Sequence, residues 1–163
     1  MGRIWKLGDN IDTDALAPGR FMHRPIGELA ENCLIDISPD FAKNAAAGDV
    51  IVAGRNFGLG SSREQAAQAL KLRGLQGVVA ESFAGIFYRN AINLGLPVFV
   101  IRSGQPAPAD GLQATLDPEA AILRHDGGET LLEPLPDFLL DMLHDGGLVP
   151  HLEKRFAKEG QKT

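Results

Sequence analysis

The sequence is poor in cysteine: Cys33 is the only one in a chain of 163 residues. A single thiol cannot form an internal disulfide, and an iron–sulfur cluster normally requires several cysteine ligands. The histidines stand too far apart for a shared metal site; they are His23, His125, His144 and His151. The chain is therefore predicted to hold no metal of its own. Cys33 lies in an expected helix over residues 26–34 and is predicted to be buried apolar filler in a protein from a reducing compartment.

Long apolar runs and an excess of basic residues are also absent. No segment approaches the roughly 20 apolar residues of a membrane span, and the N-terminus does not resemble a secretory leader. The net charge of -5 at pH 7 argues weakly against nucleic-acid binding. We therefore expect a cytoplasmic protein that binds neither membranes nor nucleic acids. Its 44% apolar and 23% charged residues are typical of globular proteins, and its length fits one domain over residues 1–163.

A glycine-rich stretch at residues 54–64 is the most informative feature of the chain. It follows an apolar run and precedes a helical pattern. Gly58 and Gly60 allow backbone conformations that other residues avoid and leave room for a ligand near the main chain. Ser61 or Ser62 is expected to cap the helix, whose N-terminus favours an anion. Because Arg63 adds a charge suited to carboxylate or phosphate, the stretch predicts an anion-binding site.

Strand and helix patterns alternate along the first two thirds of the chain. Strands are expected at residues 4–7, 50–53, 77–80 and 98–101, and helices at 25–33, 61–72 and 82–94. This order predicts an α/β fold with a partly parallel sheet and covering helices. Short strands are then expected at 113–116, 121–124 and 130–132, closing helices at 136–143 and 152–157, and a frayed tail over 158–163.

Other uses of a glycine-rich turn fit less well. A dinucleotide-binding turn would use Glu81 at the end of the next strand, but Arg63 stands where that fingerprint needs a small residue. A P-loop would need Gly-Lys-Ser/Thr, and a nucleophile elbow would need Gly-x-Ser-x-Gly; neither is present. A nucleotide-binding α/β domain and a non-catalytic interaction module remain alternative interpretations.

Three segments carry a resemblance to a known family. Asn56 to Glu64 resembles the signature of the small, or swivel, component of the aconitase superfamily. Asp12-Thr13-Asp14 followed by Pro18 is similar to the early Asp-Thr-Asp-x-x-x-Pro element of the same proteins, and residues 82–97 resemble the segment after the next strand. The resemblance covers residues 3–101 well. It is greatest to the family of free-standing 3-isopropylmalate dehydratase small subunits.

The resemblance implies a single swivelling β/β/α domain that works as one subunit of a hydro-lyase. Such enzymes dehydrate and rehydrate a hydroxy acid with a [4Fe-4S] cluster, which a separate large subunit holds in a heterodimer or heterotetramer. The small subunit, inactive alone, supplies a serine base and carboxylate-binding groups. Carried onto this chain, Ser61 matches the base, while Ser62 and Arg63 match groups that bind the substrate carboxylate.

A second set of residues is expected to support that site. Asn56, Gly58 and Gly60 shape the glycine-rich stretch. Asp12, Thr13 and Asp14 have two interpretations: a self-bonded turn after a strand, or groups that orient Arg63 or Ser61. Thr13 could equally reach the substrate.

The resemblance places the choice of substrate in residues 19–25. An arginine there would favour an extra carboxylate, and an apolar residue would favour an isopropyl group. The chain offers Phe21 and Met22 but also His23 and Arg24. The leading expectation is isomerisation of 2-isopropylmalate to 3-isopropylmalate in leucine biosynthesis, with homoaconitate or a methyl-substituted malate as the alternative. Two residues depart from the family's usual spelling, Leu59 in place of cysteine and Gln65 in place of histidine.

Overall fold

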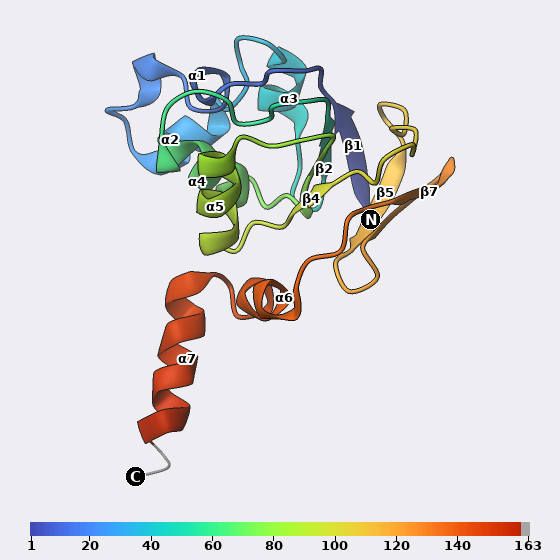
Figure 1. The fold of residues 1–163 in the computed structure, drawn as a ribbon. Helices are drawn as coiled ribbons and strands as arrows, with labels where there is room; N and C mark the ends of the chain where they lie inside the picture. Colours follow the sequence, from blue (N-terminus) through green and yellow to red (C-terminus); the bar gives the residue numbers. More distant parts are fainter. Residues whose placement is uncertain (161–163) are drawn as a thin grey trace.

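The computed structural model describes residues 1–160, in which seven strands form one mixed sheet (Figure 1). The strands are β1 (Gly2–Lys6), β2 (Val50–Ala53), β3 (Gly77–Ala80), β4 (Val98–Val100), β5 (Gln113–Asp117), β6 (Ile122–His125) and β7 (Gly128–Leu131). Their order is β4-β3-β2-β1-β5-β6-β7. Pairs from β4 to β1 are parallel, and the remaining pairs are antiparallel. The expected α/β class with a partly parallel sheet is confirmed.

The centre of the parallel half is fully enclosed. Every residue of β2 and β3 is buried, and both strands have the bounds that their apolar runs predict. A strand that is buried on both faces reads as a continuous apolar run, because neither face needs polar side chains. Val50 pairs with Gly77 and Ala53 with Ala80, so the two strands end level with each other.

The sheet curls until its two edges meet. Ile101, directly after β4, forms an isolated antiparallel bridge with Leu132, directly after β7. The Glu133 N–H donates to the Val100 carbonyl over 2.8 Å. Pairing of this kind covers edge strands that would otherwise expose unpaired backbone groups.

Two polar side chains join strands of the sheet from within. The Asp49 carboxylate, which is buried, accepts from the Arg3 backbone N–H at 2.9 Å and from Trp5 Nε1 at 2.8 Å. Gln76 Nε2, just before β3, donates to the Ala114 carbonyl in β5 at 2.9 Å. Because buried polar groups are costly without partners, the Asp49 contacts favour the pairing of β1 with β2, and the Gln76 contact favours one arrangement of the two halves of the sheet.

The helices divide into a group against the sheet and a C-terminal pair. The group comprises α1 (Thr13–Leu16), η1 (Gly19–Phe21), α2 (Ile26–Glu31), α3 (Pro39–Asn44), α4 (Glu64–Leu72) and α5 (Gly85–Asn93). Helices α1, α2, α4 and α5 gather on one side of the parallel strands in Figure 1. In α4 the side turned inward consists of Ala66, Ala67, Ala69 and Leu70, all buried. Small residues on that side let the helix lie close to its neighbours.

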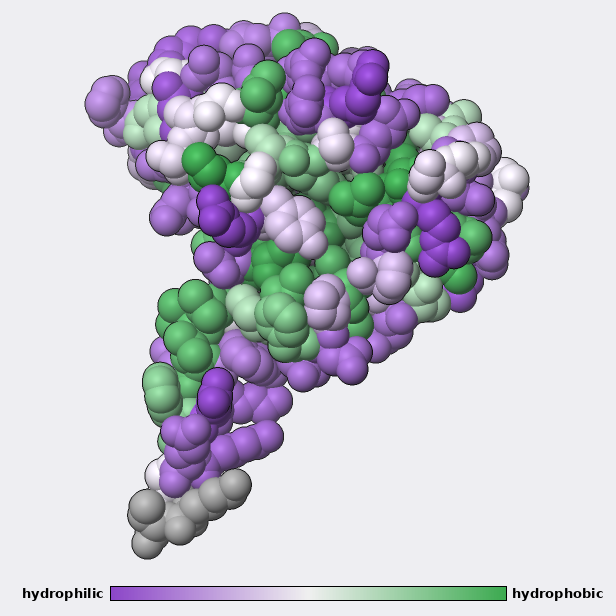
Figure 2. All heavy atoms as spheres, in the orientation of Figure 1, coloured by the Kyte–Doolittle hydropathy of each residue, from purple (hydrophilic) through white to green (hydrophobic). Residues whose placement is uncertain are grey.

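The C-terminal pair, α6 (Asp137–His144) and α7 (Leu148–Gly160), extends away from this body in Figures 1 and 2. Lys71 Nζ attaches the pair to α4 by donating to the Gly146 carbonyl at 3.1 Å. Between the two helices, the Asp145 carboxylate contacts His151 Nδ1 at 2.8 Å and Lys154 Nζ at 2.9 Å. No helix within residues 1–160 is long and apolar enough to cross a membrane.

Several expected boundaries are wrong. Helices α4 and α5 each begin three residues later than predicted, at Glu64 and Gly85, and the short helices α1 and α3 were not expected. Helix α7 begins at Leu148, not 152, because Pro150 is tolerated in a first helical turn. It continues to Gly160, so residues 158–160 of the expected frayed tail are helical; residues 161–163 lie outside the described part of the chain.

Cys33 is fully buried, as predicted, but it lies in the turn after α2, because that helix ends at Glu31 and not at residue 34. Burial raises the pKa of its thiol to about 12, and the nearby charge of Arg73 offsets only part of this effect. The thiolate is the reactive form of cysteine. In the folded protein, Cys33 therefore stays protonated throughout the neutral and mildly alkaline range.

We predict that the native chain does not react with a thiol reagent such as Ellman's reagent at mildly alkaline pH. The same chain unfolded in guanidinium chloride should react completely, because its cysteine then regains an ordinary pKa. Absorbance of the released thiolate measures both. Rapid stoichiometric labelling of the native chain would contradict the burial of Cys33.

Candidate functional site

Two loops lie side by side where β1 and β2 end. Residues 7–12 follow β1, and residues 54–63 follow β2; because these strands are parallel neighbours, both loops leave the same edge of the sheet. Asp9 Oδ1 accepts from the Arg55 N–H at 2.7 Å, and Asn56 Nδ2 donates to Asn10 Oδ1 at 3.1 Å. Asn10 and Asn56 both have left-handed backbones, with φ of 57° and 58°. Asparagine tolerates that conformation better than most residues do.

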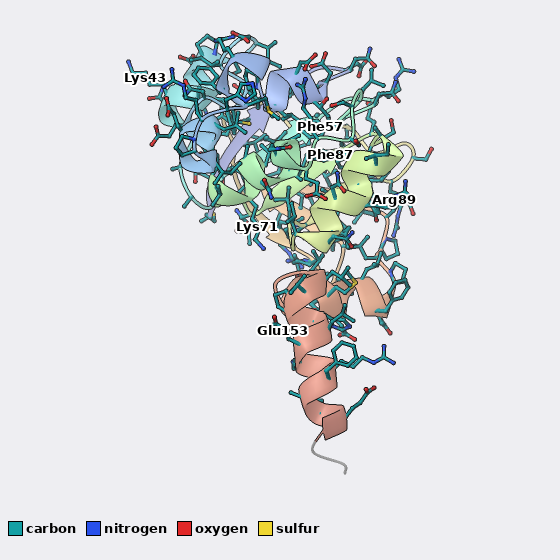
Figure 3. The ribbon with its side chains drawn as sticks, turned by 90° about the vertical axis from the view of Figure 1, so that its left-hand side faces the viewer. Lys43, Phe57, Lys71, Phe87, Arg89 and Glu153 are labelled. Carbon is teal, nitrogen blue, oxygen red and sulfur yellow. The ribbon has the colours of Figure 1, made fainter. Side chains whose placement is uncertain are left out.

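Gly58 is where the second loop passes closest to the protein interior. Its N–H donates to the Ile11 carbonyl at 2.7 Å, and its φ is 85°. A Cβ at this position would stand 2.2 Å from Phe87 Cγ. Phe87 packs edge-on against Phe57 with ring centroids 5.3 Å apart, and Figure 3 shows the two rings close together under the loop. The loop therefore packs on an aromatic cluster, and only a glycine at position 58 leaves room for this contact.

Helix α1 joins the loops through Thr13. The Thr13 N–H donates to the Leu59 carbonyl at 2.8 Å, and the Ser61 N–H donates to Thr13 Oγ1 at 3.2 Å. The two hydroxyl oxygens, Thr13 Oγ1 and Ser61 Oγ, are also 3.2 Å apart. Thr13 is buried and Ser61 is exposed. A buried hydroxyl thus holds the exposed serine from beneath.

Arg63 is directed toward the same helix. Its Nη1 donates to the Asp14 carboxylate and to the Ala17 carbonyl, the latter at 3.4 Å. Its side chain is 31% exposed, so part of the guanidinium still faces the surface. Asp12 serves α1 itself, because its Oδ1 accepts from the Ala15 N–H at 2.8 Å as the helix cap. Asp12 thus has a structural role as the cap of α1, whereas Thr13 contacts Ser61 and Asp14 contacts Arg63.

The expected serine cap of α4 is wrong. The cap position belongs to Arg63, with φ -58° and ψ 110°, and no side chain accepts a hydrogen bond there. The hydroxyl of Ser61 is used by Thr13 instead. Within residues 1–160, the exposed Ser62 side chain has no hydrogen-bond partner. Both serines therefore remain at the surface, directly before Arg63 in the chain.

The predicted substrate loop is not joined to this site. His23 and Arg24 are exposed, and Arg24 pairs with Glu28 at 3.3 Å on its own segment. Arg20 makes a two-point contact with Asp36 at 2.7 and 2.9 Å. Within residues 1–160, no hydrogen bond or ion pair links residues 19–25 to residues 54–63.

The structure also places Leu59 and Gln65, the two residues that depart from the family's usual sequence. Leu59 is 44% exposed and does not pack inward, since its carbonyl rather than its side chain contacts α1. Gln65 is half-buried in the first turn of α4. Sequence reasoning missed the parts that Asp9 and Asn10 play in pairing the loops. Their only signal was the Asp-rich composition of residues 8–14.

No group of three or more His, Cys, Asp and Glu side chains in residues 1–160 could hold a metal ion. A cluster that needs several thiolates cannot be held by the single buried Cys33. The site instead offers two hydroxyls and a guanidinium, which are groups that bind a carboxylate.

Comparisons with known proteins agree with one another and cover most of the chain. The aconitase C-terminal domain family matches residues 29–102. The chain is 47% identical over 156 residues to 3-isopropylmalate dehydratase small subunit 2 of Archaeoglobus fulgidus, covering 94% of each. It is 47% identical to the methanogen homoaconitase small subunit of Methanothermobacter thermautotrophicus, covering 94% of this chain and 90% of that one. A crystal structure of 3-isopropylmalate dehydratase from Methanocaldococcus jannaschii superposes with a TM-score of 0.91, at 40% identity, over 99% of this chain and 98% of that one.

We predict that Gly58→Ala destabilises the chain by about 2–4 kcal/mol, since the added methyl meets Phe87 and the backbone has a positive φ. Gly85→Ala is the matched control, because no atom lies within 4 Å of a Cβ there and the residue starts a helix. Urea unfolding of both variants measures the free energy of unfolding. Equal stability of the two variants would contradict the seating of the loop on Phe87.

Proposed function

The chain belongs to the aconitase C-terminal domain family, within the group that contains the small subunits of 3-isopropylmalate dehydratase, and we propose that it is the small subunit of such a hydro-lyase. The reaction proposed is the interconversion of 2-isopropylmalate and 3-isopropylmalate by dehydration and rehydration, a step of leucine biosynthesis. The observation that carries the proposal is that Ser61 and Arg63 both contact α1, through Thr13 and Asp14, with the exposed Ser62 between them.

Ser61 is proposed as the base that takes the proton from the carbon next to a substrate carboxylate. A base must reach its substrate, and the Ser61 side chain is exposed at the tip of the second loop. A serine hydroxyl ionises only with strong stabilisation of the alkoxide, which donors and a positive environment provide. The Arg63 guanidinium supplies positive charge, and the bond to Thr13 supplies a hydroxyl neighbour.

Arg63 and Ser62 are proposed to bind the carboxylate. The contacts of Arg63 with Asp14 and Ala17 both use Nη1, and within residues 1–160 its Nη2 and Nε make no hydrogen bond. A guanidinium edge of this kind matches the two oxygens of a carboxylate. Ser62 adds an exposed hydroxyl next to it. Asp14 holds the guanidinium in place through Nη1 alone.

The superfamily works with a [4Fe-4S] cluster, and we assign that cluster to the partner large subunit. When bound there it supplies a Lewis acid for the leaving hydroxyl. The present chain is proposed to form the wall of the active site that faces the cluster, because its site residues lie on an exposed surface. We therefore propose a heterodimer or heterotetramer in which the large subunit covers residues 9–14 and 54–63. A free buried thiol fits a reducing compartment, and we place the protein in the cytoplasm.

The surroundings of residues 19–25 favour the isopropyl group over a third carboxylate. Arg20 is paired with Asp36 through both Nη1 and Nη2, so its guanidinium is not left for a further anion on the substrate, whereas Arg24 contacts Glu28 through Nη1 alone. Phe21 and Met22 are half-buried and pack against the core, which brings apolar surface to this segment. Homoaconitate is the second candidate, because a homoaconitase subunit is as similar to this chain as a dehydratase subunit.

The test is co-expression with a cognate large subunit, anaerobic purification, and an ultraviolet assay for the unsaturated acid formed from 3-isopropylmalate. We expect turnover that requires both chains, with homoaconitate and citramalate as parallel substrates. Faster turnover of homoaconitate would replace the substrate while keeping the reaction class. A purified complex that turns over none of these acids would overturn the proposed function.

We predict that Ser61→Ala lowers kcat by roughly 1,000-fold or more in the two-chain enzyme while KM stays within about threefold, because the base is lost and carboxylate binding is kept. Ser62→Ala is the neighbouring control and should act mainly on KM. Steady-state kinetics with the ultraviolet assay separates the two effects. An enzyme with Ser61→Ala that kept most of its kcat would remove Ser61 from this role.

A further inference from the structure

Thr13 is the one polar side chain of the site that is buried, and its backbone is held at both ends. It is 3% exposed. Its N–H donates to the Leu59 carbonyl at 2.8 Å, and its carbonyl accepts from the Ala17 N–H at 2.8 Å. Threonine is branched at Cβ and has restricted side-chain rotation. The position of its hydroxyl is therefore set by the fold before any ligand arrives.

The direction of one hydrogen bond is fixed by chemistry. The Ser61 N–H can only donate, so Thr13 Oγ1 must be the acceptor across the 3.2 Å between them. Accepting that bond leaves the hydroxyl hydrogen of Thr13 available. Its other neighbour within residues 1–160 at hydrogen-bond distance is Ser61 Oγ, also at 3.2 Å. Thr13 Oγ1 thus contacts both the backbone and the side chain of one residue.

From this geometry we infer that Thr13 is a positioning residue that clamps Ser61 and donates its hydroxyl hydrogen to Ser61 Oγ when that oxygen loses its proton. The inference rests on the proposed role of Ser61 as a base. Between two neutral hydroxyls, either oxygen could donate. An alkoxide has no hydrogen and can only accept, so once Ser61 is ionised Thr13 must be the donor. A hydrogen bond to the charged form favours that form.

Gly60 is the residue that makes the clamp possible. Its φ of 120° lies in a region that other residues avoid, and a Cβ there would stand 2.9 Å from Thr13 Oγ1. A side chain at position 60 would therefore push the Thr13 hydroxyl away from Ser61. A glycine is thus required at position 60 because of Thr13, and at position 58 because of the aromatic cluster.

We predict that Thr13→Val lowers kcat in the two-chain enzyme on the order of 100-fold, with KM within about threefold, because it removes one preorganised donor. The kcat–pH profile should also move to higher pH, since the alkoxide is less favoured. Thr13→Ser keeps the hydroxyl and should restore kcat to within about fivefold of the wild type. Thermal unfolding of each variant confirms that it folds, and Gly60→Ala offers a second way to disturb the clamp.

A readout that does not depend on activity tests the clamp in the isolated chain. Hydrogen exchange of the Ser61 amide, followed by NMR, should be faster in Thr13→Val than in the wild type or in Thr13→Ser. If Thr13→Val keeps its kcat and its pH profile in an active enzyme, the role of Thr13 is overturned and that of Ser61 is untouched. If the wild-type pair is inactive on every hydroxy acid, the proposed function fails, and with it the part that Thr13 plays in turnover.

Discussion

The backbone contacts between the loops after β1 and β2 are the interaction on which the rest of the site depends. Parallel pairing of the two strands brings their carboxyl ends to one edge of the sheet. The Gly58 N–H then reaches the Ile11 carbonyl, and the Thr13 N–H reaches the Leu59 carbonyl. These bonds satisfy loop amides that would otherwise need water, and they fix the position of one loop relative to the other. The positions of all the proposed catalytic groups depend on this pairing of the two loops.

Glycine and asparagine allow that pairing at a cost in backbone freedom. Gly58 and Gly60 both have positive φ, and each lies too close to a neighbour to carry a side chain. Asn10 and Asn56 adopt left-handed conformations and bond to each other through their side chains. Strained or unusual backbone of this kind is retained where the surrounding structure determines it, which is common at functional sites. The aromatic cluster around Phe57 provides that support.

The exposure of the site is itself informative about how the protein works. Ser61 and Ser62 stand on the surface, whereas Thr13 and the rings below them are buried or half-buried. A serine base in open water would gain little from its neighbours, because the surrounding dielectric weakens every electrostatic contact. Covering by a large subunit would exclude water and strengthen the contacts with Arg63 and Thr13. The proposed two-chain enzyme and the proposed inactivity of the small subunit alone have this common physical origin.

The sequence by itself determined the local elements whose signal is local. The apolar runs of β2 and β3 predicted their bounds, because strands buried on both faces carry no polar residues. The residues at 54–64 indicated the family, which the comparisons confirm, and they predicted an anion site. Only the tertiary structure decided that Thr13 contacts Ser61, that Arg63 and not a serine occupies the N-cap position of α4, and that Ile101 pairs with Leu132 to close the sheet. Thr13 and Ser61 are 48 residues apart. Their contact follows from how β1 and β2 pair, and no pattern within either segment records which residues of the other it will face.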